Sequence, residues 1–241
     1  AITMYDDVLK YNQELYQAHY QIGRIYQQKG NHTEAIKRFD KALSIDKNQP
    51  KILFQKGRSF KQMGDFDNAI ETFLQATNLD EKYFIAYKNI GDLYLESKQY
   101  EDAIRYLKLA IKYDRNLKST SYISLANAYN GNDMFSDTIS SLTNDNVVKK
   151  FDEELYYWFH LATAYNGVED CEMASKASEM VIDTQGRKKF GGGYYQLGVA
   201  QWCNGKGSKS QAQKSMERAR DDRNFRENAS YFIKYELNQA N

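Results

Sequence analysis

Residues 190–210, FGGGYYQLGVAQWCNGKGSKS, contain the residue types most suggestive of chemistry in this sequence of 241 residues. They include three consecutive glycines, a Gly-Lys-Gly run and Cys203. A phosphate-binding loop needs Gly-x4-Gly-Lys followed by Ser or Thr, and a dinucleotide-binding turn needs a preceding strand. This stretch supplies neither pattern. We therefore expect residues 191–193 to form a flexible joint beside an exposed Trp202, and the Gly-Lys-Gly run to form a turn between two helices.

The remaining candidates for catalysis or metal binding are equally weak. His19, His32 and His160 have no partner four residues away and no nearby acidic ligand, as a metal site on a helix would require. No Gly-x-Ser-x-Gly nucleophile elbow is present. Paired carboxylates such as Glu153 and Glu154 are typical of solvated helix ends. We expect no catalytic residue, no metal and no cofactor, and hence a protein that is not an enzyme.

Two cysteines, Cys171 and Cys203, are predicted at the start of one helix and at the end of a later one. In a stacked array these two ends lie at the same edge, so a disulfide is geometrically conceivable. Two independent thiols are the favoured interpretation, because nothing in the sequence indicates an oxidising compartment.

The overall composition excludes several classes of protein. The formal net charge is +1, which provides no global field to recruit nucleic acid or anionic lipid. No apolar run reaches membrane-spanning length, and no targeting signal is recognisable, so the localisation stays open with the cytoplasm slightly favoured. One proline and 20 tyrosines indicate long helices with many large side chains at their contacts.

The strongest signal is a period of 34 residues. Gly23, Gly57 and Gly91 recur at this step. The same step relates three further columns: Ala35, Ala69 and Ala103; Phe39, Phe73 and Leu107; Asp46, Asp80 and Asp114. Apolar residues within each period fall on one face of two successive helices, separated by a short polar turn that contains Gly30 in the first period. One helix pair cannot bury its own apolar faces, so the pairs must stack into a solenoid.

These spacings resemble the tetratricopeptide repeat family. Its pattern is an aromatic residue, then x2-Leu-Gly-x2-Tyr, then Ala-x3-Phe, then Pro. The third period matches it with Tyr87, Ile90-Gly91, Tyr94, Ala103 and Leu107. Lys47, Glu81 and Arg115 replace the closing proline, which predicts less rigid turns between the pairs. The resemblance implies an all-α, right-handed solenoid of about six repeats with a C-terminal capping helix.

The resemblance also divides the chain into segments. Residues 1–15 would be the second helix of a truncated preceding repeat, so the chain is expected to be a fragment of a longer array. Three regular units would occupy 16–117, at 16–49, 50–83 and 84–117. Three degenerate units would occupy 118–222, at 119–152, 155–188 and 191–222, and residues 223–241 would form the cap.

In this family the first helices line a concave face that receives segments of partner proteins. The resemblance therefore implies a peptide-binding surface in two parts. The N-terminal part is cationic, because arginines and lysines from successive repeats fall side by side, and the C-terminal part offers aromatic rings and amides. The predicted positions are Tyr20, Arg24, Gln27, Lys51, Phe54, Arg58, Lys61, Lys88, Asp92, Asn127, Asn130, Tyr156, Phe159, Asn166, Tyr195 and Trp202.

One subfamily holds a C-terminal carboxylate with Lys and Asn one turn apart, where this sequence has Tyr20 and Arg24. That clamp is absent, so chaperone-tail binding is not expected. The leading prediction is a scaffold that binds a peptide or protein segment, with acidic groups as suitable ligands. The alternatives are a spacer or self-association array that uses its open repeat ends, and a single-stranded nucleic-acid binder with Tyr20 and Phe54 as stacking platforms. The near-neutral charge disfavours nucleic acid.

Overall fold

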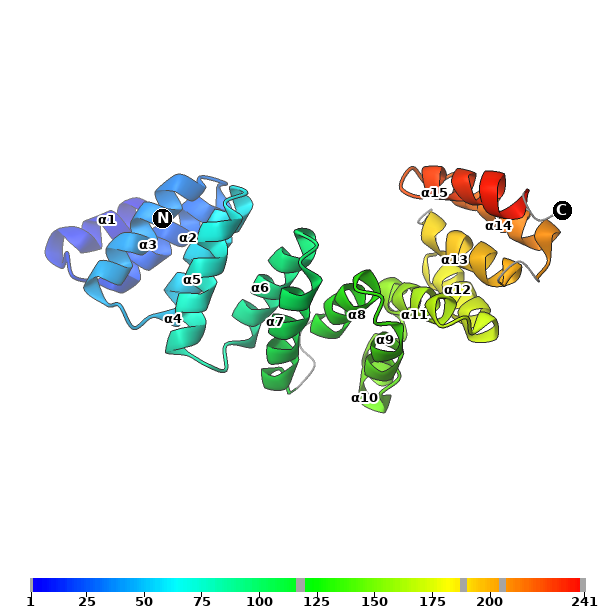
Figure 1. Cartoon of the computed structure of the whole chain (residues 1–241). Helices are drawn as coiled ribbons and strands as arrows, with labels where there is room; N and C mark the ends of the chain where they lie inside the picture. Colours follow the sequence, from blue (N-terminus) through cyan, green and yellow to red (C-terminus); the bar gives the residue numbers. More distant parts are fainter. Residues whose placement is uncertain (1, 116–119, 187–189, 204–206, 239–241) are drawn as a thin grey trace. The chain divides into compact units, whose positions relative to one another are not determined.

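The computed structural model describes residues 2–115, 120–186, 190–203 and 207–238, and all secondary structure in these residues is helical (Figure 1). The prediction of an all-α chain is confirmed. The chain divides into two compact units, 1–121 and 122–241, which are described separately. Within the described residues no helix combines the length and apolar character needed to cross a membrane.

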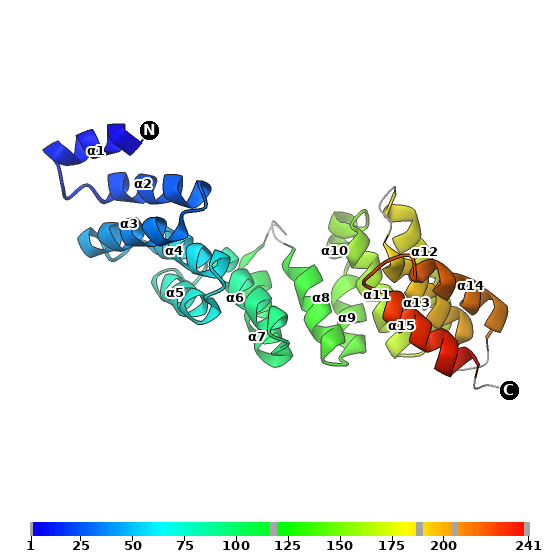
Figure 2. The same cartoon turned by 90° about the horizontal axis from the view of Figure 1, so that it is seen from above.

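The N-terminal unit contains three helix pairs preceded by a single helix. Its helices are α1 (Ile2–Tyr11), α2 (Tyr16–Gln28), α3 (His32–Ile45), α4 (Pro50–Gln62), α5 (Phe66–Leu79), α6 (Phe84–Glu96) and α7 (Tyr100–Tyr113). The pairs α2–α3, α4–α5 and α6–α7 pack internally, and α3 packs on α4 and α5 on α6, so that the three pairs stack in chain order (Figure 2). This is the arrangement that the 34-residue period predicts.

The C-terminal unit contains three further pairs, α8–α9, α11–α12 and α13–α14, with additional helices. Its elements are α8 (Ser121–Gly131), α9 (Phe135–Leu142), α10 (Asp145–Phe151), α11 (Leu155–Gly167), α12 (Cys171–Thr184), α13 (Gly191–Trp202), α14 (Lys209–Ala219), α15 (Arg226–Tyr231) and the π-helix η1 (Phe232–Leu237). Ala229 and Leu237 of the last two elements are buried, and Phe225, Phe232 and Ile233 pack against the final pair.

Close approach of the two helices explains the recurrent glycine of each pair. A methyl group added at Gly57 would lie 2.7 Å from ring carbons of Phe73, and Gly23 and Gly91 face Phe39 and Leu107 in the same way. The phenylalanine and leucine side chains are fully buried. The 34-residue period therefore reflects a contact, present in each of these three pairs, between a glycine and a large apolar side chain.

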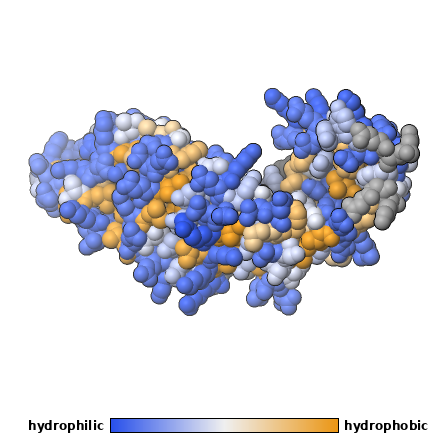
Figure 3. Space-filling view, in the orientation of Figure 1, coloured by the Kyte–Doolittle hydropathy of each residue, from blue (hydrophilic) through white to orange (hydrophobic). Residues whose placement is uncertain are grey.

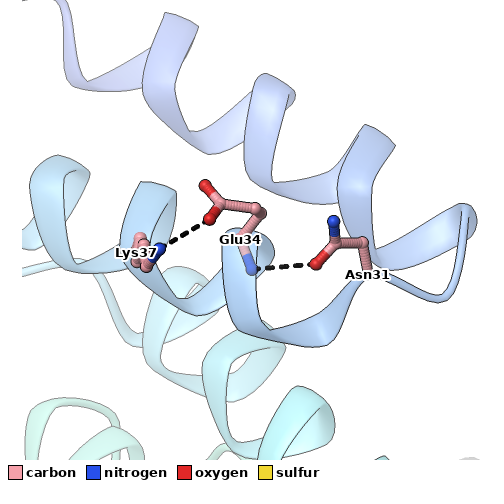
Figure 4. A network of polar contacts seen from close by, with 3 residues as sticks. All are labelled: Asn31, Glu34 and Lys37. Atoms are coloured by element: carbon pink, nitrogen blue, oxygen red, sulfur yellow. Dashed lines mark hydrogen bonds and ion pairs between the residues drawn. The ribbon is translucent and has the colours of Figure 1, made fainter.

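Side-chain caps begin several of the second helices. Asn31 Oδ1 accepts a hydrogen bond from the Glu34 amide at 3.2 Å, and Lys37 forms an ion pair with the Glu34 carboxylate at 2.6 Å (Figure 4). Asp65, Asp170 and Ser208 cap α5, α12 and α14 in the same way. Asparagine, aspartate and serine are preferred at this position because their oxygens satisfy free amides of the first turn.

The turn between the two helices of most pairs contains a residue with a left-handed backbone. Gly30 and Gly64 have φ of 76° and 77°, and Lys98, one period later, has φ of 58°. Asp133 and Glu169 adopt the same conformation in the C-terminal unit. The turn geometry thus persists where glycine does not, because the packing of the two helices determines it.

The helix α10 was not predicted. It follows α9 after two residues, and the Asn144 side chain caps it by accepting a hydrogen bond from the Asn146 amide. Val147 and Phe151 are buried in the same core as Leu142 and Tyr157. The short α9, of eight residues, leaves part of that core open, and α10 closes it.

The expectation of a flexible glycine joint is wrong. Residues 191–193 form the first turn of α13, and all three glycines are buried. A methyl group would approach Asp222 at the first glycine, Phe190 and Phe159 at the second, and Val181 at the third, all closer than 3.0 Å. The Asp222 carboxylate also accepts a hydrogen bond from the Gly191 amide at 2.8 Å. These glycines therefore permit close packing; Gly205 and Lys206 of the Gly-Lys-Gly run lie outside the described residues.

The favoured interpretation of the cysteines is also wrong. Cys171 and Cys203 form a disulfide, with their Cα atoms 5.8 Å apart. The bond joins the first residue of α12 to the residue that follows α13. Stacking of the pairs places these two helix ends at the same edge. This is the arrangement in which the sequence allows a disulfide.

Candidate functional site

A polar pocket of the N-terminal unit lies between α2 and α4. Its volume is about 460 Å³, and its lining residues are Arg24, Gln27, Gln28, Gly30, His32, Gln55, Arg58 and Gln62. Three of these, Arg24, Gln27 and Arg58, were predicted from the sequence. The additional glutamines were missed, although Gln28 and Gln62 are themselves 34 residues apart.

The pocket is cationic. Its lining, taken from the described residues, includes two guanidinium groups and no carboxylate. Arg58 Nη1 donates a hydrogen bond to Gln55 Oε1 at 3.3 Å, which orients that guanidinium along the pocket wall. Arginine and amide donors together suit a carboxylate ligand, because each guanidinium can donate two parallel hydrogen bonds.

The ring of Tyr20 lies beside one of the two arginines, Arg24, and beside Lys51. The Arg24 guanidinium and the Lys51 ammonium both lie 5.9 Å from the Tyr20 ring centroid. Burial raises the pKa of Tyr20, with Arg24 partly opposing the effect, and burial raises the pKa of Tyr83 to about 12. These phenols therefore remain neutral and do not cancel the positive charge of the pocket.

Two of the predicted contact residues are unsuited to direct binding. Tyr20 and Phe54 are each only 8% exposed and pack in the cores of successive helix pairs. Phe54 lies against Phe73 and Tyr83, with ring centroids 5.5 and 5.3 Å apart. The sequence pattern placed these rings on the concave face, but a large ring at that position reaches the neighbouring helix and is covered by it. Stacking of nucleic-acid bases on them is excluded by this burial.

The other predicted cations of the N-terminal unit contribute less to the positive charge of the pocket. Lys88 forms an ion pair with Asp92, also a predicted site residue, at 2.5 Å, so the two charges cancel. Lys61 is half-buried and does not line the pocket, whereas Lys51 is exposed beside Tyr20. The cationic surface is thus narrower than predicted.

Amides predicted to hold a peptide backbone instead join helices of the chain. Asn130 Nδ2 donates to the His160 carbonyl at 2.9 Å, and Asn166 Nδ2 donates to the Gln196 carbonyl at 3.0 Å. Gln27 Nε2 makes the equivalent bond to the Gln55 carbonyl at 2.9 Å. Each bond runs from one first helix to the next first helix. The repeat period correctly groups these positions, but the hydrogen-bond partner is internal.

The aromatic residues predicted in the C-terminal unit form one cluster with rings that were not predicted. Phe159 and Tyr195 contact Phe225, with ring centroids 6.0 and 5.9 Å apart. Tyr156 is more than half exposed and lies against Phe190. Phe225 comes from the connection between α14 and α15, so the chain itself covers part of this face. Asn127 is exposed and Trp202 is half-buried, and neither joins the cluster.

Metal binding has no support in the described part of the chain, where no group of three His, Cys, Asp or Glu side chains converges. The face of the N-terminal unit seen in Figure 3 is largely hydrophilic, with smaller apolar patches.

Two models of the tetratricopeptide repeat (TPR) match this chain, one over residues 14–82 and the other over residues 54–116. Residues 14–116 of the chain carry tetratricopeptide repeats. Solved TPR structures extend the likeness of fold to both units. The C-terminal part of a TPR repeat-containing protein from Cytophaga hutchinsonii is 14% identical, with a TM-score of 0.72 over 94% of this chain and 92% of that one.

Two other solved structures are similar. MamA from Desulfovibrio magneticus RS-1 is 23% identical, with a TM-score of 0.63 over 70% of this chain and 94% of that one. YrrB, described as a TPR protein with an unusual peptide-binding site, is 16% identical, with a TM-score of 0.67 over 78% and 95% of the two chains. No curated protein sequence matches the chain. The TM-scores and coverages of these structures establish the TPR solenoid fold.

Proposed function

We propose that this TPR chain is a non-enzymatic scaffold that binds an acidic segment of a partner protein in the pocket between α2 and α4. The observation that carries the proposal is the pairing of Arg24 and Arg58 across one pocket whose described lining contains amides and no carboxylate. TPR arrays in general serve as protein-interaction scaffolds, and the YrrB structure is described as having a peptide-binding site. Both observations favour a polypeptide ligand.

Charge reversal at the two arginines tests this proposal. The variant Arg24→Glu/Arg58→Glu is expected to bind a hexapeptide of alternating glutamate and serine at least about tenfold more weakly, since two charge-assisted contacts become repulsive. Fluorescence anisotropy of the labelled peptide measures the change. A peptide with glutamine in place of glutamate is expected to bind neither protein.

The matched control carries the same change in charge elsewhere. Lys82 and Lys214 are exposed and lie outside the pocket. Lys82→Glu/Lys214→Glu should leave peptide affinity within about twofold at physiological salt, because distant surface charges are screened. Equal weakening by both variants would show a general charge effect and would contradict the assignment of the pocket.

Self-association is a second candidate function, favoured by the exposed face of α1. Met4, Val8 and Tyr11 lie one turn apart on this helix and are 70%, 43% and 93% exposed. One period later Ala42 occupies the position of Val8 and is fully buried inside a helix pair. A helix covers the position of Val8 in all three later regular pairs, where Ala42, Ala76 and Ala110 are fully buried, so this part of α1 is suited to a helix of a second copy.

Light scattering over a range of protein concentrations tests this candidate. The wild-type protein is expected to show a rising average mass, and Met4→Lys/Val8→Lys is expected to stay monomeric, because charged side chains prevent burial of this face. A wild-type protein that remains a monomer at every concentration would remove this function.

A further inference from the structure

A second pocket of the N-terminal unit lies on the other side of α4. Its volume is about 520 Å³, and its lining residues are Asp40, Leu43, Ser44, Lys47, Leu53, Lys56, Gln75, Asn78 and Leu79. These residues belong to α3, α4, α5 and the turn after α3. Successive helical residues are rotated by about 100°, so Leu53 and Lys56 project from α4 on the side opposite to Gln55, Arg58 and Gln62. The two pockets therefore share a helix but no lining residue.

The apolar part of this pocket consists of leucines. Leu53 is buried at 7% exposure, Leu43 is half-buried, and Leu79 is 44% exposed at the opening. At the rim, Lys56 and Asp40 form an ion pair at 2.6 Å and are thereby held to one side. Gln75, Asn78 and Lys47 provide polar groups around the opening. The pocket thus has an apolar interior and a rim of hydrogen-bond donors.

The next repeat shows what fills the equivalent space. Residues 34 positions after Leu53 and Leu79 are Tyr87 and Tyr113, and their rings stack with centroids 5.9 Å apart. The residue equivalent to Leu43 is Thr77, and its side chain forms a hydrogen bond with the Tyr87 side chain. The same backbone arrangement therefore accommodates two aromatic rings in one repeat and leaves a pocket in the preceding one.

We propose that this pocket binds an aromatic side chain, tyrosine or phenylalanine, of a partner polypeptide. An aromatic ring suits it because the equivalent space one repeat later is occupied by stacked rings. The exposed Leu79 leaves the pocket open to solvent, which allows a ring to enter while its main chain stays at the surface. The amides of Gln75 and Asn78 can then donate hydrogen bonds to the carbonyl groups that flank the ring.

The experiment uses two soluble probes and observes the leucine methyl signals of the protein by NMR. N-acetyl-L-tyrosinamide is expected to shift the methyl signals of Leu43, Leu53 and Leu79, and to bind about fivefold more tightly than p-cresol, because only the amide probe can use the rim. Equal affinity of the two probes would overturn the assignment to a polypeptide ligand, and absence of shifts with both probes would overturn the pocket.

Two variants test whether the probes bind in the space that the tyrosines fill in the next repeat. Leu43→Thr/Leu53→Tyr/Leu79→Tyr introduces the residues of the next repeat and is expected to abolish binding of both probes. The reverse variant, Tyr87→Leu/Tyr113→Leu, is expected to create a second binding site, so the proposal remains testable even if the first variant folds poorly. Unchanged binding in the first variant, or no new site in the second, contradicts it.

This inference is independent of the arginine pocket. Arg24→Glu/Arg58→Glu is expected to leave the affinity for N-acetyl-L-tyrosinamide unchanged, because neither arginine lines the second pocket. Loss of acidic-peptide binding with retained tyrosinamide binding would support both sites. Loss of both in that variant would contradict the separation of the two sites.

Discussion

Replacement of Cys171 and Cys203 by serine is expected to lower the free energy of unfolding of the C-terminal unit by about 3 kcal/mol. The disulfide closes a loop with a sequence separation of 32 residues. A cross-link of this span removes conformations from the unfolded chain, and the stabilisation grows with the logarithm of the loop length. It also joins two consecutive helix pairs, so its loss affects the stacking of α12 and α13 directly.

Tryptophan fluorescence measures this effect selectively, because Trp158 and Trp202, the two tryptophans of the chain, both belong to the C-terminal unit. The urea midpoint of the oxidised protein is expected to exceed that of Cys171→Ser/Cys203→Ser. Adding a phosphine reductant should bring the wild-type midpoint down to that of the variant and leave the variant unchanged. Identical midpoints for oxidised and reduced wild-type protein would contradict the disulfide.

The sequence predicts the helix pairs well because each pair repeats one physical contact. Gly57 and Phe73 must lie together in the second pair, and the same two positions recur in the first and third. A residue whose role depends on contacts within its own repeat is therefore recognised by spacing alone. This explains why all three regular pairs have the expected helices.

Contacts between repeats are harder to predict, because the partner residue varies. Tyr20 was placed on an exposed face, yet the following helix covers it. Asn130 and Asn166 were expected to bind a ligand, yet they bind carbonyl groups of the next first helix. Their shared spacing from Ala126 and Ala162 indicated a common role, but spacing does not reveal whether that role is internal or external.

Features that occur only once cannot be predicted from the repeat period. The helix α10 fills a gap left by the short α9, and no other described pair has such a helix. The glycines at 191–193 resemble a flexible segment by composition, and only their neighbours Asp222, Phe190 and Val181 show that close packing requires them. The pocket of Arg24 and Arg58 could be predicted in part, because the two arginines occupy the same position in consecutive repeats.

The second large effect expected of this protein is a loss of stability in the C-terminal unit below pH 6.5, caused by His160. This histidine is buried, and burial lowers its pKa from 6.5 to about 4. Between these two values the unfolded chain binds a proton that the folded unit does not bind. The free energy of unfolding therefore falls as the pH drops through 6.5 and continues to fall until about pH 4.

The expected loss is about 2 kcal/mol between pH 7.5 and pH 5, since the free energy of unfolding falls by about 1.4 kcal/mol for each pH unit between the two pKa values. His160 is the one histidine of the C-terminal unit, because His19 and His32 lie in the N-terminal unit.

Urea denaturation followed by tryptophan fluorescence at pH 7.5 and pH 5 measures the effect. His160→Phe retains a planar ring and the backbone carbonyl that accepts the Asn130 hydrogen bond, and it should remove most of the pH dependence. His32→Gln, in the other unit, should leave the pH dependence intact. A His160→Phe variant that loses as much stability as the wild type on acidification would assign the effect to other groups, and the buried neutral histidine would then have no part in it.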